Sequence, residues 1–281
     1  MSKLAVELVR ALFCGLPRKK FRMAVFIAAG DESADQNPKG AFFYGGFAAP
    51  LDIWEGVFSE AWNERVLNGP PRIPYLHMTD ILSPQWREDH GLRDFEARLD
   101  EASRVIRSTG SLIPVLVSVD ENDFNATLRL PFKPKPNRKA GTLEPDYICY
   151  ICFAYAQLQW LYEFRKDAER VDFWVEKGPL TKYINGFHKT LAGACEYVGS
   201  PHLVPLIGDM LPVGKERIPA QAADMLGWHA RNKDRGTLDP SHLRRYGQMV
   251  EWGKRSGFKT TISSDLLKNL AGALAKRAAE E

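Results

Sequence analysis

Apolar runs bounded by turn residues alternate with amphipathic stretches along most of the chain. Runs rich in β-branched, aromatic or small residues are typical of buried strands, and four occur at residues 23–30, 41–49, 111–119 and 171–176. A shorter run, 202–207, predicts a fifth strand. The first three strands are expected to form an antiparallel meander, and the last two, which alternate with helices, to add in parallel.

Apolar positions at helical spacing predict the remaining elements. The expected helices cover residues 2–16, 54–67, 92–108, 145–170, 181–198, a segment beginning at Pro219, and 265–281. The pattern therefore predicts an α/β protein with a mixed five-stranded sheet flanked by helices and a helical insertion at about 50–110. We expect an N-terminal helix and basic lead at 1–22, a main domain at 23–235 and a C-terminal helical extension at 236–281.

Composition narrows the class of protein. The chain has 281 residues, of which 44% are hydrophobic and 26% charged, as is usual for globular proteins. Its net charge of +3 is too small to indicate a nucleic-acid partner by itself. The four cysteines do not suggest a secreted disulfide framework, and Cys149 and Cys152 are interpreted as buried small residues. No apolar run suggests a membrane span, so we expect a cytoplasmic protein without a membrane partner.

Acidic residues stand at the ends of two predicted strands and in a later helix. Asp31 and Glu32 follow the first strand, Glu176 ends the fourth, and Asp224 lies three residues after Gln221 on one helical face. Carboxylates are costly to bury without a cation or a partner. If the first and fourth strands are parallel neighbours, Asp31 and Glu176 lie at the same end of the sheet. Strand alternation ranks Glu32 lower than Asp31.

This set of acids suits a particular chemistry. Phosphodiester hydrolysis requires an activated water and a positive charge for the leaving oxygen, and Mg²⁺ or Mn²⁺ held by carboxylates can supply both. Asp31, Glu176 and Asp224 are the candidate catalytic and metal-binding residues, with Gln221 orienting a ligand or water. Taken singly, each acid also has an ordinary interpretation as a turn, strand-end or solvated helix residue.

Two further features are candidates for supporting roles. His77 and Asp80, in the predicted insertion, are interpreted either as a proton-shuttling or phosphate-contacting pair, or as a packed or capping pair. A proline-rich loop carries the basic residues Lys133, Lys135, Arg138 and Lys139. These side chains would contact a nucleic-acid backbone without reading bases, and an ordinary solvated loop is the competing interpretation.

These motifs together resemble a known family. Asp31-Glu32-Ser33, the aromatic glycine-containing second strand, Leu76-His77-Met78-Thr79-Asp80 and Gln221-Ala222-Ala223-Asp224 are similar to the family designated domain of unknown function 3800. The resemblance runs from about Met23 to Arg231. It implies a ribonuclease H-like fold, in which Asp31 and Asp224 map onto the presumed metal-binding acids. Glu176 occupies the acidic position expected on the fourth strand.

Three functions follow as hypotheses. The first is a metal-dependent nuclease acting on DNA or RNA, and the second is a non-catalytic module of the same fold that binds nucleic acid or protein. The third is hydrolysis of a small phosphorylated molecule, which a narrow pocket would favour. DNA or RNA specificity and the oligomeric state stay open at the level of sequence.

Overall fold

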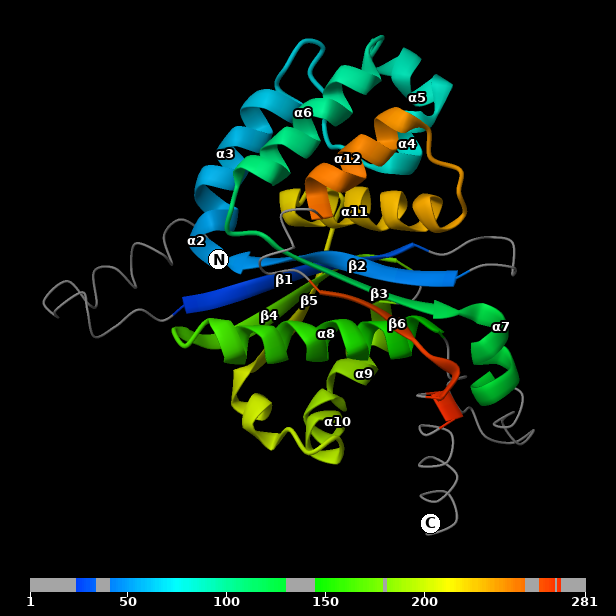
Figure 1. The fold of residues 1–281 in the computed structure, drawn as a ribbon. Coiled ribbons are helices and arrows are strands. Elements are labelled where there is room, and N and C mark those ends of the chain that lie inside the picture. Colours follow the sequence, from blue (N-terminus) through cyan, green and yellow to red (C-terminus); the bar gives the residue numbers. More distant parts are fainter. Residues whose placement is uncertain are drawn as a thin grey trace, which may run out of the picture.

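The computed structural model describes residues 24–33, 41–129, 145–178, 181–250, 258–265 and 267–268. Its described strands form one mixed sheet in the order β5-β4-β1-β2-β3-β6 (Figure 1). The strands are β1 (Ala24–Ser33), β2 (Ala41–Pro50), β3 (Ile113–Asp120), β4 (Ala168–Glu176), β5 (Ile207–Val213) and β6 (Phe258–Ile262). The protein is therefore an α/β protein built around a single sheet, with six described strands instead of the predicted five.

Strand directions agree with the sequence pattern. β1, β2 and β3 form an antiparallel meander. β4 pairs in parallel with β1, and β5 pairs in parallel with β4. β6 adds in parallel to β3 at the opposite edge. The first and fourth strands are thus parallel neighbours, which is the condition under which Asp31 and Glu176 were expected at the same end of the sheet.

Helices cover both faces of the sheet (Figure 1). The upper layer in the figure contains α2 (Leu51–Ile53), α3 (Ser59–Trp62), α4 (Met78–Leu82), α5 (Pro84–Asp89), α6 (Phe95–Ser108), α11 (Ile218–Asp234) and α12 (Pro240–Val250). The lower layer contains α8 (Pro145–Phe164), α9 (Thr181–His188) and α10 (Leu191–Tyr197), while α7 (Glu121–Phe124) follows β3. Each layer buries its own apolar cluster against the sheet, as strand alternation requires.

The segment between β2 and β3 is helical, as its pattern predicts. Its first helical run extends from Leu51 to Leu67 with a kink at Gly56, whose backbone dihedrals are not helical. A π-helical turn at Trp54–Phe58 lies between α2 and α3, and a second one at Asn63–Leu67 follows α3. Trp54 anchors this helix on the sheet, since its indole Nε1 donates a hydrogen bond of 3.0 Å to the carbonyl of Ile27 in β1. The same helix supplies Trp62, which contacts the candidate site described below.

Two strand predictions are wrong. The segment 202–207 is not a strand, because Pro201–Leu206 forms a 3₁₀ helix and β5 begins only at Ile207. Pro201 stands in the first turn of this helix, where its fixed φ and missing N–H are tolerated. The C-terminal region 236–281, predicted to be helical, also contributes β6. Both unpredicted strands lie at edges of the sheet, where long apolar runs are not required.

Two helix boundaries also differ from the prediction. The helix expected to reach about Arg170 ends at Phe164, and β4 already begins at Ala168. The helix expected from Thr181 to Val198 is interrupted between His188 and Leu191, which separates α9 from α10. In α10, Cys195 is buried among apolar side chains, as is Cys149 in α8. The burial of Cys149 agrees with its interpretation as a small core residue.

Candidate carboxylate site

The carboxyl ends of β1 and β4 meet under α11. Gly30 of β1 pairs with Val175 of β4, so the next residues, Asp31 and Glu176, lie at the same level of two neighbouring parallel strands. Glu176 ends β4, whereas β1 continues to Ser33, so Asp31 lies within the strand and does not follow it as predicted. Alternation gives both positions the same side as Ala29 and Trp174, which belong to the apolar cluster on the α11 face. The predicted placement of these two acids at one end of the sheet is therefore correct.

Close packing of α11 on the sheet brings a third acid to this end. Gly45 of β2 pairs with Asp31. A Cβ atom built on Gly45 would lie 3.6 Å from the Cα atom of Gly227 in α11, so helix and strand approach to within backbone contact. Asp224 is three residues before Gly227, or about one helical turn. The helix thereby carries Asp224 to the end of the sheet where Asp31 and Glu176 lie.

Asp224 and Gln221 also hold the chain segment that precedes α4. The backbone N–H of Met78 donates to Asp224 Oδ2 at 2.6 Å, and that of Leu76 donates to Gln221 Oε1 at 3.1 Å. Gln221 Oε1 also accepts from Trp62 Nε1 at 2.8 Å, and Gln221 Nε2 donates to the carbonyl of Lys215 at 3.0 Å. The Gln221 amide thus makes its hydrogen bonds to other protein groups, and it helps to fix the position of the residue between Leu76 and Met78.

That residue is His77, whose imidazole lies among three carboxylates. His77 Nε2 is 3.7 Å from Asp224 Oδ1 and 3.9 Å from Glu176 Oε1. On the other side of the ring, Nδ1 is 3.3 Å from Asp80 Oδ2. Lys215, in the connection from β5 to α11, completes the group: its Nζ donates to Asp80 Oδ2 at 3.2 Å and lies 3.5 Å from His77 Nδ1. We call His77, Asp80, Glu176, Lys215 and Asp224 the carboxylate cluster.

The two acids that face His77 Nε2, Glu176 and Asp224, both have raised pKa values. Burial raises the pKa of Glu176, and the negative charge of Asp224 raises it further, although His77 and Lys215 act in the opposite direction. Burial likewise raises the pKa of Asp224, against the favourable effects of His77, the Met78 N–H and Lys215. The available positive charge therefore does not offset the cost of ionising these two acids. Such a site gains free energy when it binds a cation or a proton.

Asp31 lies beside a second cation. Arg231, two helical turns beyond Asp224 on α11, has its pKa lowered by burial, while the charges of Asp224 and Asp31 counteract that effect. Arg231 therefore interacts with both acids, and it links Asp31 electrostatically to the carboxylate cluster.

The structure thus brings together most of the predicted site residues and adds two that the sequence analysis missed. Lys215 lies three residues before the start of α11, the helix that carries Asp224, and Arg231 is seven residues after Asp224 on the same helical face. These positions relative to a candidate acid were the only signals in the sequence for the two residues. The predicted basic residues Lys133, Lys135, Arg138 and Lys139 lie outside the described residues, as does the side chain of Glu32.

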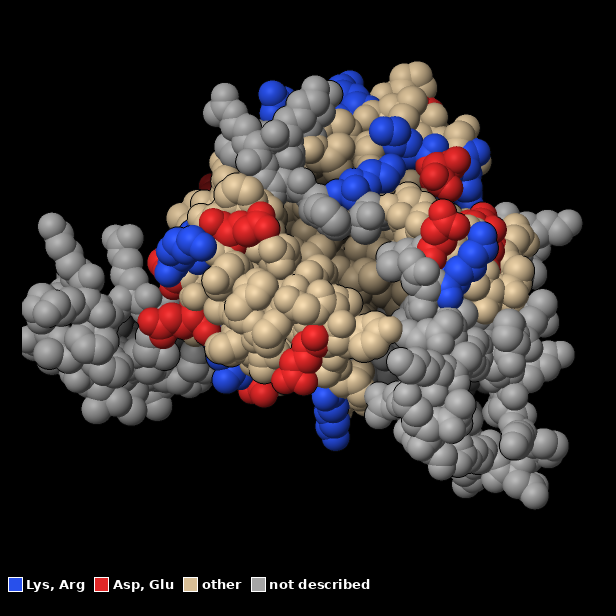
Figure 2. Space-filling model, turned by 60° about the horizontal axis from the view of Figure 1, so that its bottom comes forward, with Lys and Arg blue, Asp and Glu red and all other residues tan. Residues whose placement is uncertain are grey.

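Charged side chains are distributed unevenly over one face of the molecule. Figure 2 turns the lower side of Figure 1 forward, where basic and acidic side chains are interspersed around a largely uncharged centre. Among the described residues visible on this face, basic side chains are most frequent toward the top of the view. Within the described ranges, no helix is long and apolar enough to cross a membrane.

In the part of the chain that the structure describes, no group of three or more His, Cys, Asp or Glu side chains has an arrangement that could hold a metal ion.

Comparisons with protein-family models, curated proteins and solved structures give no match. The case for a function therefore rests on the geometry and charge of the carboxylate cluster.

Proposed function

We propose that this protein is a divalent-metal-dependent hydrolase of phosphodiester bonds in DNA or RNA, with a ribonuclease H-like fold. The observation that carries the proposal is the convergence of Glu176 and Asp224 on His77 Nε2, at the end of two parallel strands. Buried acids with raised pKa values next to a titratable ring are typical of sites that bind cations or transfer protons.

The strand arrangement supports the fold assignment. An antiparallel meander of β1, β2 and β3, with β4 and β5 added in parallel beside β1, agrees with the topology expected from the pattern of the sequence. The helices between β2 and β3 agree with the expected insertion.

Glu176 and Asp224 are the residues that would hold Mg²⁺ or Mn²⁺, with Asp31 as the third acid. Their donor chemistry fits, because Mg²⁺ is usually bound through one or two carboxylates and keeps several waters, without a complete protein cage. Asp224 Oδ2 already accepts a backbone hydrogen bond, whereas Oδ1 faces His77. When bound, such a cation supplies an activated water and balances charge on the phosphate.

The side chains of the cluster have distinct parts in this proposal. Asp80 contacts His77 Nδ1 and orients the ring, which leaves Nε2 as the atom that moves a proton in the site. Gln221 fixes the backbone on the N-terminal side of His77, and Asp224 fixes it on the other side. Arg231, near both Asp31 and Asp224, limits the repulsion between these acids.

Calorimetric titration with Mn²⁺ tests the cation site directly. We expect binding by the wild-type protein and its loss in Asp224→Asn, which removes a charge but keeps an oxygen that can accept from the Met78 N–H. Asp234→Asn, on an exposed residue at the end of the same helix, is the matched control and should bind like wild type. Equal Mn²⁺ affinity in Asp224→Asn and wild type, or no binding by wild type, contradicts the proposal.

Cleavage assays test the reaction itself. Labelled single-stranded and double-stranded DNA and RNA should be cut in the presence of Mn²⁺, and Asp31→Asn or Asp224→Asn should reduce the rate by at least roughly 100-fold because the cation is no longer held. Circular dichroism and urea unfolding must show that each variant is folded. Unchanged cleavage in folded Asp31→Asn removes Asp31 from the mechanism.

One observation favours a second candidate, a non-catalytic ribonuclease H-like module that binds nucleic acid or protein. Asp224 and Gln221 accept backbone hydrogen bonds from Met78 and Leu76, which is a structural use of both side chains. In such a module, Asp224→Asn would leave partner binding unchanged, and no nucleic acid would be cut with any divalent cation.

A further inference from the structure

Lys215 supplies a positive charge to all three acids of the carboxylate cluster. Its Nζ donates to Asp80 at 3.2 Å, and its charge counteracts part of the rise that burial causes in the pKa values of Glu176 and Asp224. Burial disfavours the ammonium group, but the hydrogen bond to Asp80 and the charges of Asp80 and Glu176 outweigh this effect and raise the pKa of Lys215. Lys215 therefore stays charged and acts as a counter-ion to the acids of the cluster.

The Lys215 side chain is more exposed to solvent than the acids of the carboxylate cluster. The Lys215 side chain is 41% exposed and that of Asp80 25%, whereas those of Glu176 and Asp224 are 13% and 10% exposed. The cluster is thus open to solvent on the side of Lys215 and closed on the side of α11. A charged ligand from solvent meets the ammonium group first.

The backbone and side chain of Lys215 are held to different degrees. Gln221 Nε2 donates to the Lys215 carbonyl, so the main chain is fixed relative to α11. The ammonium group is held by one acid at 3.2 Å and lies 5.9 Å from the centre of the Tyr75 ring. A lysine side chain has four rotatable bonds, so its charge can move by several ångströms while the backbone stays in place.

We propose that Lys215 is the resident counter-charge of the carboxylate cluster, which a divalent cation displaces, and that the displaced ammonium group then binds a phosphate oxygen of the nucleic acid. This inference rests on the proposed function. Two cationic groups beside the same acids repel each other, so each weakens the binding of the other by the same factor. The released ammonium group stays at the open side of the site, where a phosphate enters.

Two measurements on one variant, Lys215→Met, test both halves of this inference. Without nucleic acid, Lys215→Met should bind Mn²⁺ roughly tenfold more tightly than wild type, because a repelling charge is gone. With Mn²⁺ saturating, it should bind a labelled, hydrolysis-resistant phosphorothioate oligonucleotide roughly tenfold more weakly. The slope of log affinity against log salt should also fall by about 0.7, as expected for one lost contact to a single strand.

The controls separate charge from shape. Lys215→Arg keeps the positive charge and should resemble wild type in both titrations. Lys233→Met removes another lysine of the α11 region that lies over an aromatic ring, 4.5 Å from the centre of Tyr246, and it should change neither affinity. Equal urea midpoints for the three variants and wild type establish that folding does not explain the differences.

The outcomes distinguish this inference from the proposed function. If Asp224→Asn abolishes Mn²⁺ binding but Lys215→Met binds Mn²⁺ no more tightly than wild type, displacement is refuted and the cation site stands. If Lys215→Met gains Mn²⁺ affinity but binds the oligonucleotide like wild type, the phosphate contact is refuted and the inference is overturned. If wild type binds no Mn²⁺, the proposed function and this inference both fail.

Discussion

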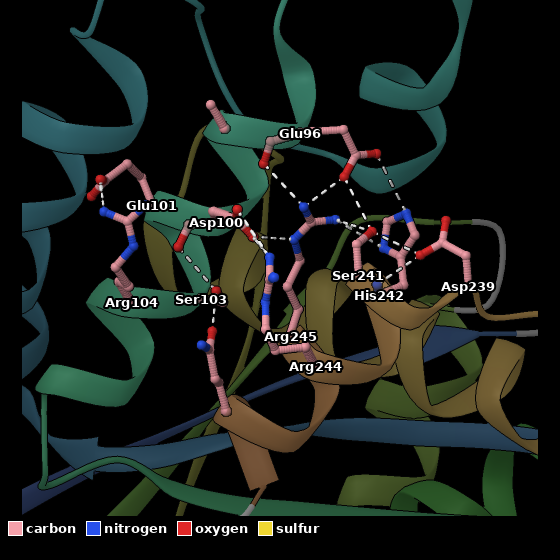
Figure 3. A network of polar contacts seen from close by, with 12 residues as sticks. Glu96, Asp100, Glu101, Ser103, Arg104, Asp239, Ser241, His242, Arg244 and Arg245 are labelled. Carbon is pink, nitrogen blue, oxygen red and sulfur yellow. Dashed lines mark hydrogen bonds and ion pairs between the residues drawn. The ribbon is translucent and has the colours of Figure 1, made fainter.

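The carboxylate cluster and a second polar group, between α6 and α12, lie on the same side of the sheet but balance their charges differently. We call the second group, which consists of Glu96, Asp100, His242, Arg244 and Arg245, the arginine network (Figure 3). Arg245 is only 1% exposed, and it contacts Asp100 Oδ1 at 2.7 Å through Nε and Glu96 Oε2 at 2.5 Å through Nη2. Arg244 adds two contacts to Asp100, at 3.0 and 3.1 Å.

The pKa values of the acids show the consequence. Burial raises the pKa of Asp100, but hydrogen bonds from Arg245 and Arg244 outweigh it, so the pKa is lowered overall. Glu176 and Asp224 have the opposite net shift, because the effect of their burial is not outweighed by the nearby positive charge. Acids in close contact with guanidinium groups stabilise the fold, whereas acids that lack such contacts are available to a ligand. This difference is why we place the function in the carboxylate cluster.

The largest expected effect comes from removing the central cation of the arginine network. Arg245→Met should lower the free energy of unfolding by about 2–4 kcal/mol, because it breaks contacts to two acids and to the Glu96 carbonyl between α6 and α12. Arg244→Met, on a side chain that is 57% exposed, should cost less than about 1 kcal/mol. Urea unfolding measures both, and equal losses would contradict the distinction between these arginines.

Acid should weaken the region around the arginine network through His229 of α11. His229 Nδ1 donates to the Met225 carbonyl at 2.7 Å, and Nε2 lies 3.0 Å from His242 Nδ1. Burial lowers the pKa of His229 to about 3 and also lowers that of His242. The unfolded chain therefore binds these protons first, and stability is lost as pH falls below the unfolded value of about 6.5.

For His229 alone the expected loss between pH 7 and pH 5 is about 2 kcal/mol. Urea unfolding at both values measures it, and His229→Phe provides the comparison, because a ring that does not titrate should make the dependence shallower even if the variant is less stable at pH 7. The same slope in the variant and wild type would show that His229 does not control this dependence.

The sequence predicted the central part of this fold better than its edges. Strands β1 to β4 are long apolar runs because helices cover both of their faces, and buried surface is what a hydrophobic pattern records. β5 contains Gly208, Asp209 and Pro212, and β6 is short. Edge strands need less apolar surface, so their pattern resembles that of loops.

The residues of the candidate site likewise fall into those that the sequence predicted and those that only the structure showed. Asp31, Glu176 and Asp224 were found because acids next to buried elements are unusual at the level of sequence. Lys215 was not found, since its importance arises from distances to residues more than 130 positions away, such as Asp80. The role of Gln221 also depended on structure, because its partners Trp62 and Leu76 are distant in sequence.

The smallest expected effect is also the most direct test of the comparison, because one kind of substitution should have opposite signs in the two regions. At pH 7 and without divalent cations, Glu176→Gln should raise the free energy of unfolding by roughly 1 kcal/mol, since it removes a charge that is costly to bury. Asp100→Asn should lower it by a similar amount, because it weakens charge-assisted hydrogen bonds from two arginines.

The dependence of these changes on pH identifies their cause. The pKa of Glu176 is raised in the folded state, so the cost of its charge is present at pH 7 and is relieved as pH falls through that raised value. The advantage of Glu176→Gln should therefore disappear by about pH 4, where wild-type Glu176 is protonated in the folded protein. Urea unfolding of both proteins from pH 7 to pH 4 measures this convergence. A constant difference would show that the gain comes from packing, and the carboxylate cluster would then no longer differ from the arginine network in its need for a cation.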